Sequence, residues 1–188
     1  MVRMDRVEAA FRRVPRSGFV PPDVRREAVW DVPVPIGFGQ TNSQPTTVQL
    51  MLTWLEVEPG DKVLDVGSGS GWTTALLGYI VGPKGSVVAV EKIPELVAFG
   101  KHNAARAGIT NATFVGAGKT LGWPAQAPYD RILVSASARA LPESLVGQLK
   151  NGGKMIIPVG GTILEISKLA DGTLDSNSHT GFLFVPLL

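Results

Sequence analysis

The hydrophobic positions along this chain follow two periods, which predicts alternating helices and strands. Residues 46–57 place Val48, Met51, Leu52 and Leu55 on one helical face, the spacing of an amphipathic helix. The helices predicted elsewhere cover residues 4–13, 72–81, 94–107 and 141–149. Short apolar runs predict strands at residues 62–66, 86–90, 113–115, 131–134, 154–159, 163–169 and 182–187.

This order of elements predicts the fold class. Strands that alternate with helices are typical of an α/β protein with a doubly wound, mostly parallel, Rossmann-like sheet of about seven strands and helices on both faces. The last three predicted strands have no helix between them, and Asp171-Gly172 marks a turn. We therefore expect an antiparallel edge at the C-terminal end of the sheet.

The N-terminal quarter of the chain has a different pattern. Residues 14–45 contain six prolines, at positions 15, 21, 22, 33, 35 and 45, which excludes a central strand or a long helix. The segment also carries apolar residues, so we expect it to pack as a lid. The prediction is a single domain, residues 1–188, in which the helix and lid-like segment of residues 1–45 lie on a core of residues 46–188.

Composition removes several classes of protein. The 188 residues include no cysteine and two histidines, so we expect no disulfide scaffold, no cysteine nucleophile and no metal site. The chain has no apolar run long enough for a spanning helix and no apolar N-terminal core of a signal peptide, which favours a cytoplasmic location without membrane contact.

The net charge of +2 is distributed unevenly. Residues 1–26 contain seven arginines and three acids, which gives +4, so the remainder sums to −2. A basic arm can meet nucleic acid or an acidic partner. No aromatic residue alternates with these arginines as in base-stacking proteins. We therefore favour a solvated helix face, expect no nucleic-acid partner, and expect a monomer.

The segment after the strand at residues 62–66 carries the most chemical information. It reads Gly67-Ser68-Gly69-Ser70-Gly71 and leads directly into a helix. Glycines let the chain turn sharply and let a ligand approach the backbone, and the following helix presents free N–H groups. Glu91 lies twenty residues after Gly71, at the end of the next strand, where a carboxylate can accept ribose hydroxyls.

The spacing of the glycines separates the candidate cofactors. Dinucleotide folds favour G-x-G-x-x-G, which would need glycine at position 72, where this chain has Trp72. G-x-G-x-G preceded by Asp65 is instead the pattern of methyltransferases that use S-adenosylmethionine. Asp65 could face the ligand's amino group, directly or through water. A dinucleotide site and a purely structural turn remain as alternatives.

Beyond the glycine loop, the chain resembles the protein-L-isoaspartate O-methyltransferases nearly end to end. The most specific stretches are Gly39-Gln40-Thr41-Asn42-Ser43-Gln44-Pro45 and the ending Phe184-Val185-Pro186-Leu187; residues 11–21, 128–132, 148–153 and 158–160 add to them. The resemblance implies a Rossmann-like methyltransferase fold. It also implies methyl transfer from S-adenosylmethionine, with S-adenosylhomocysteine as product, to the free α-carboxylate of L-isoaspartyl residues in damaged proteins or peptides.

The resemblance also implies the site residues. It places a catalytic serine at Ser43, whose alternative role is to cap the helix that begins near Thr46. It implies acceptor contacts at Asn42 and Val159. The cofactor-binding residues implied by the loop and the resemblance together are Thr41, Ser43, Asp65, Gly67, Ser68, Gly69, Ser70, Gly71, Glu91, Lys92, Gly116, Ala117 and Gly118.

Three departures from the family pattern keep other functions open. Ala117 stands where the family usually has an aspartate that contacts adenine, which removes a hydrogen bond of about 1 kcal/mol. Asn42 replaces the usual isoleucine, and the loop at Gly161-Thr162 is shorter. The alternatives are a carboxyl methyltransferase with another peptide or small-acid acceptor, and a non-catalytic binding module that keeps the fold. His179 is expected in a solvated polar loop.

Overall fold

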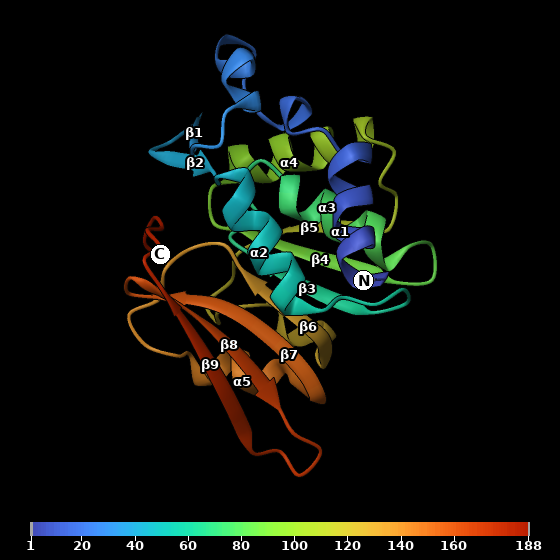
Figure 1. Cartoon of the computed structure of the whole chain (residues 1–188), viewed down its shortest axis with the longest axis vertical. Helices are drawn as coiled ribbons and strands as arrows, with labels where there is room; N and C mark the ends of the chain where they lie inside the picture. Colours follow the sequence, from blue (N-terminus) through green and yellow to red (C-terminus); the bar gives the residue numbers. More distant parts are fainter. Residues whose placement is uncertain (1, 188) are drawn as a thin grey trace.

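A seven-stranded sheet forms the centre of the computed structural model, which describes residues 2–187 (Figure 1). The strand order is β5-β4-β3-β6-β7-β8-β9. The first five strands in this order pair in parallel, whereas β7–β8 and β8–β9 are antiparallel. This confirms the predicted fold class. The bounds are β3 (Lys62–Val66), β4 (Ser86–Glu91), β5 (Ala112–Gly116), β6 (Tyr129–Val134), β7 (Leu149–Val159), β8 (Thr162–Lys168) and β9 (Leu174–Thr180).

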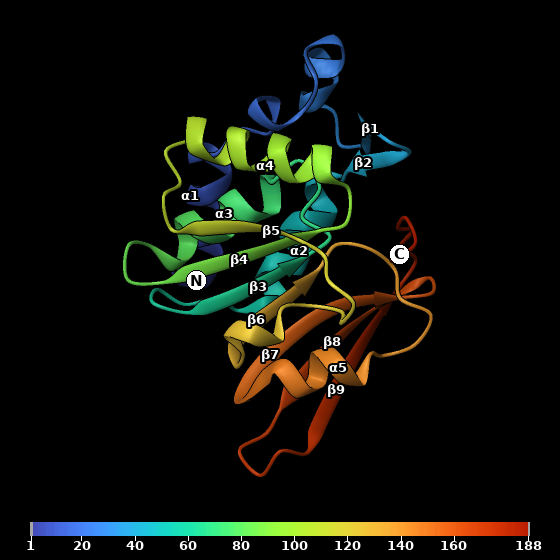
Figure 2. The same ribbon diagram turned by 180° about the vertical axis from the view of Figure 1, so that it is seen from behind.

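Helices cover both faces of this sheet. One apolar cluster joins α1 (Val2–Arg13), α2 (Pro45–Leu55) and α3 (Trp72–Val81) to one face, and α5 (Glu143–Gln148) packs on the other. The helix α4 (Pro94–Arg106) lies beside α3 and against β4 and β5 (Figure 2). Side chains alternate between the faces of a strand, so Val63 joins the first cluster and Leu64 the second.

The proline-rich N-terminal segment has more regular structure than its sequence predicted. It forms the 3₁₀ turns η1 (Arg16–Phe19), η2 (Pro22–Val29) and a hairpin of β1 (Val34–Gly37) and β2 (Gln40–Asn42). Pro35 is tolerated because this hairpin is a separate two-stranded sheet in which both strands are edges. The hairpin projects from the body on the side where the C-terminal tail ends (Figure 1). The division between residues 1–45 and 46–188 stays a prediction.

The C-terminal part of the structure differs from the sequence-based prediction in its last strand and in the position of His179. The last strand is β9, whereas the strand predicted at residues 182–187 forms only an isolated bridge between Pro186 and Ser137. β9 is polar because it is an edge strand with mostly exposed side chains. His179 was expected in a loop but lies on β9, where its ring stacks on Trp54 at a centroid distance of 3.8 Å.

The turn of the N-terminal hairpin holds an aromatic residue in an unfavourable conformation. Gly37, Phe38 and Gly39 all have positive φ, and the φ of Phe38 is 56°. A left-handed conformation costs an ordinary L-residue about 1–2 kcal/mol, whereas asparagine tolerates it. Phe38 is also 58% exposed, so packing offsets little of this cost.

Replacing Phe38 with asparagine should therefore raise the free energy of unfolding, by about 0.5–1 kcal/mol. Urea denaturation followed by circular dichroism measures the change. Trp30→Asn is a matched control, since Trp30 is 56% exposed but has an ordinary φ of −83°. Equal effects of the two substitutions would show that backbone strain at Phe38 contributes nothing.

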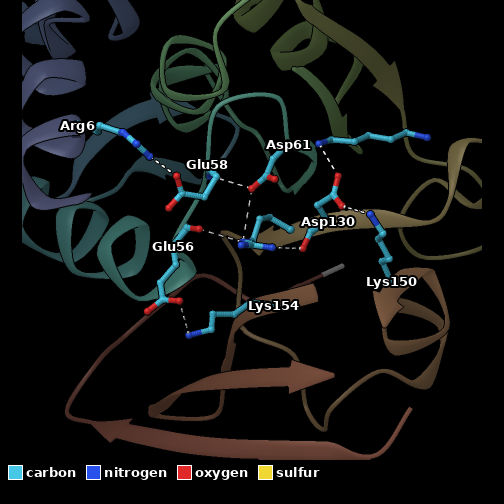
Figure 3. A network of polar contacts seen from close by, with 9 residues as sticks. Arg6, Glu56, Glu58, Asp61, Asp130, Lys150 and Lys154 are labelled. Carbon is cyan, nitrogen blue, oxygen red and sulfur yellow. Dashed lines mark hydrogen bonds and ion pairs between the residues drawn. The ribbon is translucent and has the colours of Figure 1, made fainter. Parts of the chain in front are cut away.

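A network of charged side chains lies at the amino ends of β3 and β6 (Figure 3). Arg131 forms an ion pair with Asp61 at 3.6 Å, and its Nε donates to the carbonyl of Glu56 at 3.1 Å. Asp130 accepts from the backbone N–H of Lys62 at 2.9 Å. Ligands of doubly wound sheets bind at the opposite, carboxyl ends of the strands. We therefore interpret this network as structural.

Candidate functional site

The glycine loop connects β3 to α3 in the manner that its sequence predicted. Gly67, Gly69 and Gly71 have φ values of 76°, 51° and 85°, a region that glycine enters at no steric cost. Gly71 also lies against α4, because a Cβ built there would be 2.9 Å from the Cα and the carbonyl oxygen of Gly100. The loop therefore requires glycine for its conformation and for its close contact with α4.

A cavity of about 450 Å³ opens beside this loop, within the size range of small-ligand sites. It lies at the carboxyl ends of β3 and β4, near the point where the strand order reverses between β3 and β6, which is where doubly wound folds bind ligands. Its other walls come from the hairpin, the loops at residues 117–122 and 135–142, and the tail at residues 185–187.

Glu91 lines this cavity, and backbone N–H groups hold its carboxylate. Oε2 accepts from Gly69 at 2.9 Å, and Oε1 accepts from Lys92 at 2.7 Å and Ile93 at 3.0 Å. A carboxylate has about four acceptor sites, so Oε2 retains capacity for one further donor. Glu91 thus fixes the glycine loop and can still accept one hydroxyl from a ligand.

Asp65 has a different position, beneath the loop. It faces α3, and its Oδ2 accepts from the hydroxyls of Thr73 at 2.8 Å and Thr74 at 2.6 Å. The residue is 0% exposed and is absent from the cavity lining. Burial raises the pKa of Asp65 to about 6, against the opposing effect of the threonine hydrogen bonds. Asp65 therefore anchors the start of α3 from below.

Replacing Asp65 with asparagine should stabilise the protein near neutral pH. The pKa of Asp65 rises on folding, so the folded state binds more protons between about pH 4 and 6, and stability falls as the pH increases through that window. Above it the carboxylate costs about 3 kcal/mol, which asparagine avoids. Denaturation at pH 4 to 8 should show the difference between D65N and wild type growing up to pH 6. A difference that does not change with pH would show that Asp65 ionises normally.

The predicted site residues fall into three groups. Those that line the cavity are Thr41, Gly67, Gly69, Glu91, Lys92, Ala117 and Gly118. A smaller recess of about 30 Å³ behind the loop is lined by Asn42, Ser43, Ser68 and Ser70, together with Thr41, Gly67 and Gly69. Asp65, Gly71, Gly116 and Val159 line neither space. Val159 instead forms a bridge with Ala138 next to the cavity wall.

Ser43 does not cap α2, which was one of its two expected roles. The N-cap position is Gln44, and no side-chain cap bond forms there. Asp31 performs that function from the preceding segment, since it accepts from the backbone N–H of Thr46 at 2.9 Å and from its hydroxyl at 2.7 Å. The hydroxyl of Ser43 is therefore not required at the helix end.

Several cavity residues were absent from the sequence-based prediction. They are Ile36, Lys119, Thr120, Leu121, Arg139 and the tail residues 185–187. The tail could have been predicted, because Phe184-Val185-Pro186-Leu187 was already recognised as a specific stretch. Lys119 and Arg139 stand in loops without a motif, so nothing in their local sequence indicates the cavity.

Buried polar atoms at the loop test whether the site suits a nucleoside cofactor. Among the described residues, Asp65 Oδ1 and Ser68 Oγ are buried without a hydrogen-bond partner, which is uncommon unless a further group satisfies them. Ser68 lines the recess behind the loop, whereas Asp65 lines neither space. Ser68 Oγ, the glycine backbone and the free capacity on Glu91 therefore suit a ligand that carries hydroxyl and amino donors.

The fold and this site define a Rossmann-like methyltransferase. The family profile described as "Protein-L-isoaspartate(D-aspartate) O-methyltransferase (PCMT)" matches residues 1–188. The chain belongs to this family. Protein-L-isoaspartate O-methyltransferases of Methanopyrus kandleri and Pyrococcus horikoshii are 47% and 44% identical to it over its full length, which spans 85% and 87% of those proteins.

Solved structures agree with this assignment. A protein-L-isoaspartate O-methyltransferase superposes with a TM-score of 0.87 at 30% identity, covering 97% of this chain but 61% of that one. A Plasmodium falciparum structure named for the same family, in complex with S-adenosyl-L-homocysteine, gives 0.85 at 28% identity and covers 98% and 90% of the two chains. In the described part of this chain, no helix has the length and apolarity of a membrane span.

Proposed function

We propose that this chain transfers a methyl group from S-adenosylmethionine to the free α-carboxylate of L-isoaspartyl residues in damaged proteins or peptides. The observation that carries the proposal is the cavity at the carboxyl ends of β3 and β4, in a chain of this family, with Glu91 and the glycine loop on its wall. The family relatives and the S-adenosylhomocysteine complex support it.

The cofactor would lie along the loop and β4. Gly67 and Gly69 would let the cofactor come close to the backbone of the loop, and Glu91 would accept a ribose hydroxyl. Thr41 and Lys92 lie on the same wall of the cavity. Gly116, Ala117 and Gly118 would flank the adenine. The side chain of Ala117 has no acceptor, so the adenine amino group would depend on groups other than the usual aspartate. The N–H of Ala117 already donates to the carbonyl of Glu91 at 2.8 Å, so it is not free to donate to a ring nitrogen.

The reaction requires the acceptor carboxylate to be aligned with the methyl group, and it requires no general base. The bound cofactor supplies an electrophilic methyl group on its sulfonium. An acceptor carboxylate with a pKa near 4 is already ionised at neutral pH, so the chain's task is to orient it and to exclude water. Ser43 lines the recess that adjoins the cavity, and we assign it the orienting role. Val159 contributes on the acceptor side through the segment at Ala138.

The decisive experiment is transfer of labelled methyl from S-adenosylmethionine to an isoaspartyl peptide, with the aspartyl peptide of identical sequence as control. We expect label only on the isoaspartyl form. Equal labelling, or none on either peptide, would reject the proposed acceptor. The monomeric state, the lack of a nucleic-acid partner and the cytoplasmic location stay predictions.

A further inference from the structure

The basic N-terminal segment contains one arginine that is not solvated. Arg16 is 5% exposed, whereas the sequence favoured a solvent-facing cluster. Its Nη1 donates to the carbonyl of Trp30 at 3.1 Å and its Nη2 to that of Val32 at 2.8 Å. The guanidinium also lies 5.6 Å from the centre of a Trp72 ring, within the range of a cation–π contact. Arg16 thus ties the segment before the hairpin to the start of α3.

Arg16 also holds the end of β2 through Asn42. Its Nε donates to Asn42 Oδ1 at 2.7 Å and its Nη2 to the carbonyl of Asn42 at 2.8 Å. A planar guanidinium matches two acceptors in this fork arrangement, which a lysine cannot reproduce. Asn42 is itself buried, so its side chain has a fixed orientation.

The other end of the Asn42 amide reaches the glycine loop. Its Nδ2 donates to the hydroxyl of Ser70 at 3.0 Å, and Asn103 of α4 donates to the carbonyl of Ser70 at 3.1 Å. Both ends of the Asn42 amide are therefore engaged within the protein. The isoleucine that is usual at this position could form neither bond, so this relay depends on the one residue in the hairpin motif that departs from the family pattern.

We propose that Asn42 is a positioning residue that couples the hairpin of β1 and β2 to the glycine loop through the relay Arg16–Asn42–Ser70. The relay fixes Thr41 and Ser43, the neighbours of Asn42, relative to Gly69 and Gly71. Cofactor affinity then depends on a side chain that faces away from the main cavity. This inference deepens the proposed function and rests on it, because it takes the loop to be the cofactor site.

Asn42→Leu tests the relay, because leucine keeps the volume and removes both side-chain bonds. We expect S-adenosylhomocysteine to bind about tenfold more weakly by calorimetry, the loss of one to two hydrogen bonds, and the KM for S-adenosylmethionine to rise. Asn42→Asp should recover most of the affinity, since its carboxylate can accept from both Arg16 and Ser70. A leucine variant that binds within twofold of wild type would overturn the proposal.

Asn111→Leu is the matched control for a merely structural effect. The Asn111 amide donates to the carbonyls of Gly78 at 3.0 Å and Gly82 at 2.8 Å, away from both cavities. Loss of the Asn111 bonds should lower the unfolding midpoint but leave the affinity for S-adenosylhomocysteine within twofold of wild type. Equal losses of affinity in both leucine variants would show that Asn42 acts only through the overall stability of the fold.

If Asn42→Leu does not fold, Ser70→Ala removes only the bond between Asn42 and Ser70, and unchanged affinity in that variant would also overturn the proposal. Calorimetry needs no acceptor, so failure of the proposed function remains distinguishable.

Discussion

Gly71→Ala should abolish measurable cofactor binding and lower the free energy of unfolding by about 3 kcal/mol. Two effects add at this position. The new Cβ would lie 2.9 Å from the Cα and the carbonyl oxygen of Gly100, which are backbone atoms that cannot rotate away. The residue would also keep a φ of 85°, which is strained for alanine. The loop and α4 must therefore separate, and the N–H groups at the start of α3 move with the loop.

Calorimetry with S-adenosylhomocysteine and urea denaturation measure the two effects of Gly71→Ala. Gly108→Ala is the matched control, because Gly108 also has a positive φ of 77° but has open space around its Cβ position. It should cost about 1 kcal/mol and leave affinity unchanged. Gly100→Ala should weaken binding from the other side, though less than Gly71→Ala, since its Cβ would lie 2.9 Å from Cε1 of Phe114, 3.1 Å from the Gly69 carbonyl oxygen and 3.2 Å from the Gly71 nitrogen. A folded Gly71→Ala variant with wild-type affinity would contradict the packing argument.

The strands that stand out most clearly in the sequence are the buried ones next to the centre of the sheet. β3 and β4 read as apolar runs because both of their faces are covered. β9 did not, because an edge strand needs no apolar side chains. In the irregular tail that follows it, Phe182, Phe184 and Leu187 pack against the core, whereas Leu183 is 95% exposed. Hydrophobicity reports burial, so an apolar run such as residues 182–187 can also belong to a segment that packs without forming a strand.

The residues of the site also differ in how far the sequence predicts them. Glu91 and the glycine loop were predictable because their conformations follow from local sequence and from the order of β3, α3 and β4. Arg16 was not, because its partners lie 14 to 26 residues away, and nothing in a run of arginines distinguishes the buried one. The glycine loop and Glu91 can therefore be predicted from neighbouring residues in the sequence. The position of the hairpin cannot, because it depends on contacts between residues that are distant in the sequence.

Glu91→Gln should weaken S-adenosylhomocysteine binding by about 10- to 100-fold, the range expected for losing hydrogen bonds to a charged acceptor. All three groups that contact the Glu91 carboxylate are N–H donors. In either orientation, the amide of glutamine presents its NH₂ to at least one of them. The less disruptive orientation places it toward Gly69, which breaks the bond to the glycine loop and removes the remaining acceptor site for a ribose hydroxyl.

Calorimetry at neutral pH measures this effect, and Glu95→Gln is the control. Glu95 is an exposed acid in the first turn of α4, four residues further along the chain, so its substitution removes the same charge near the site without removing an acceptor from the loop. We expect wild-type affinity for that variant. If the two substitutions weaken binding equally, Glu91 acts only through its long-range charge; if Glu91→Gln binds within threefold of wild type, the carboxylate holds neither the loop nor the ribose. Only loss at Glu91 alone is consistent with a carboxylate that organises the glycine loop and receives the cofactor at the same oxygen.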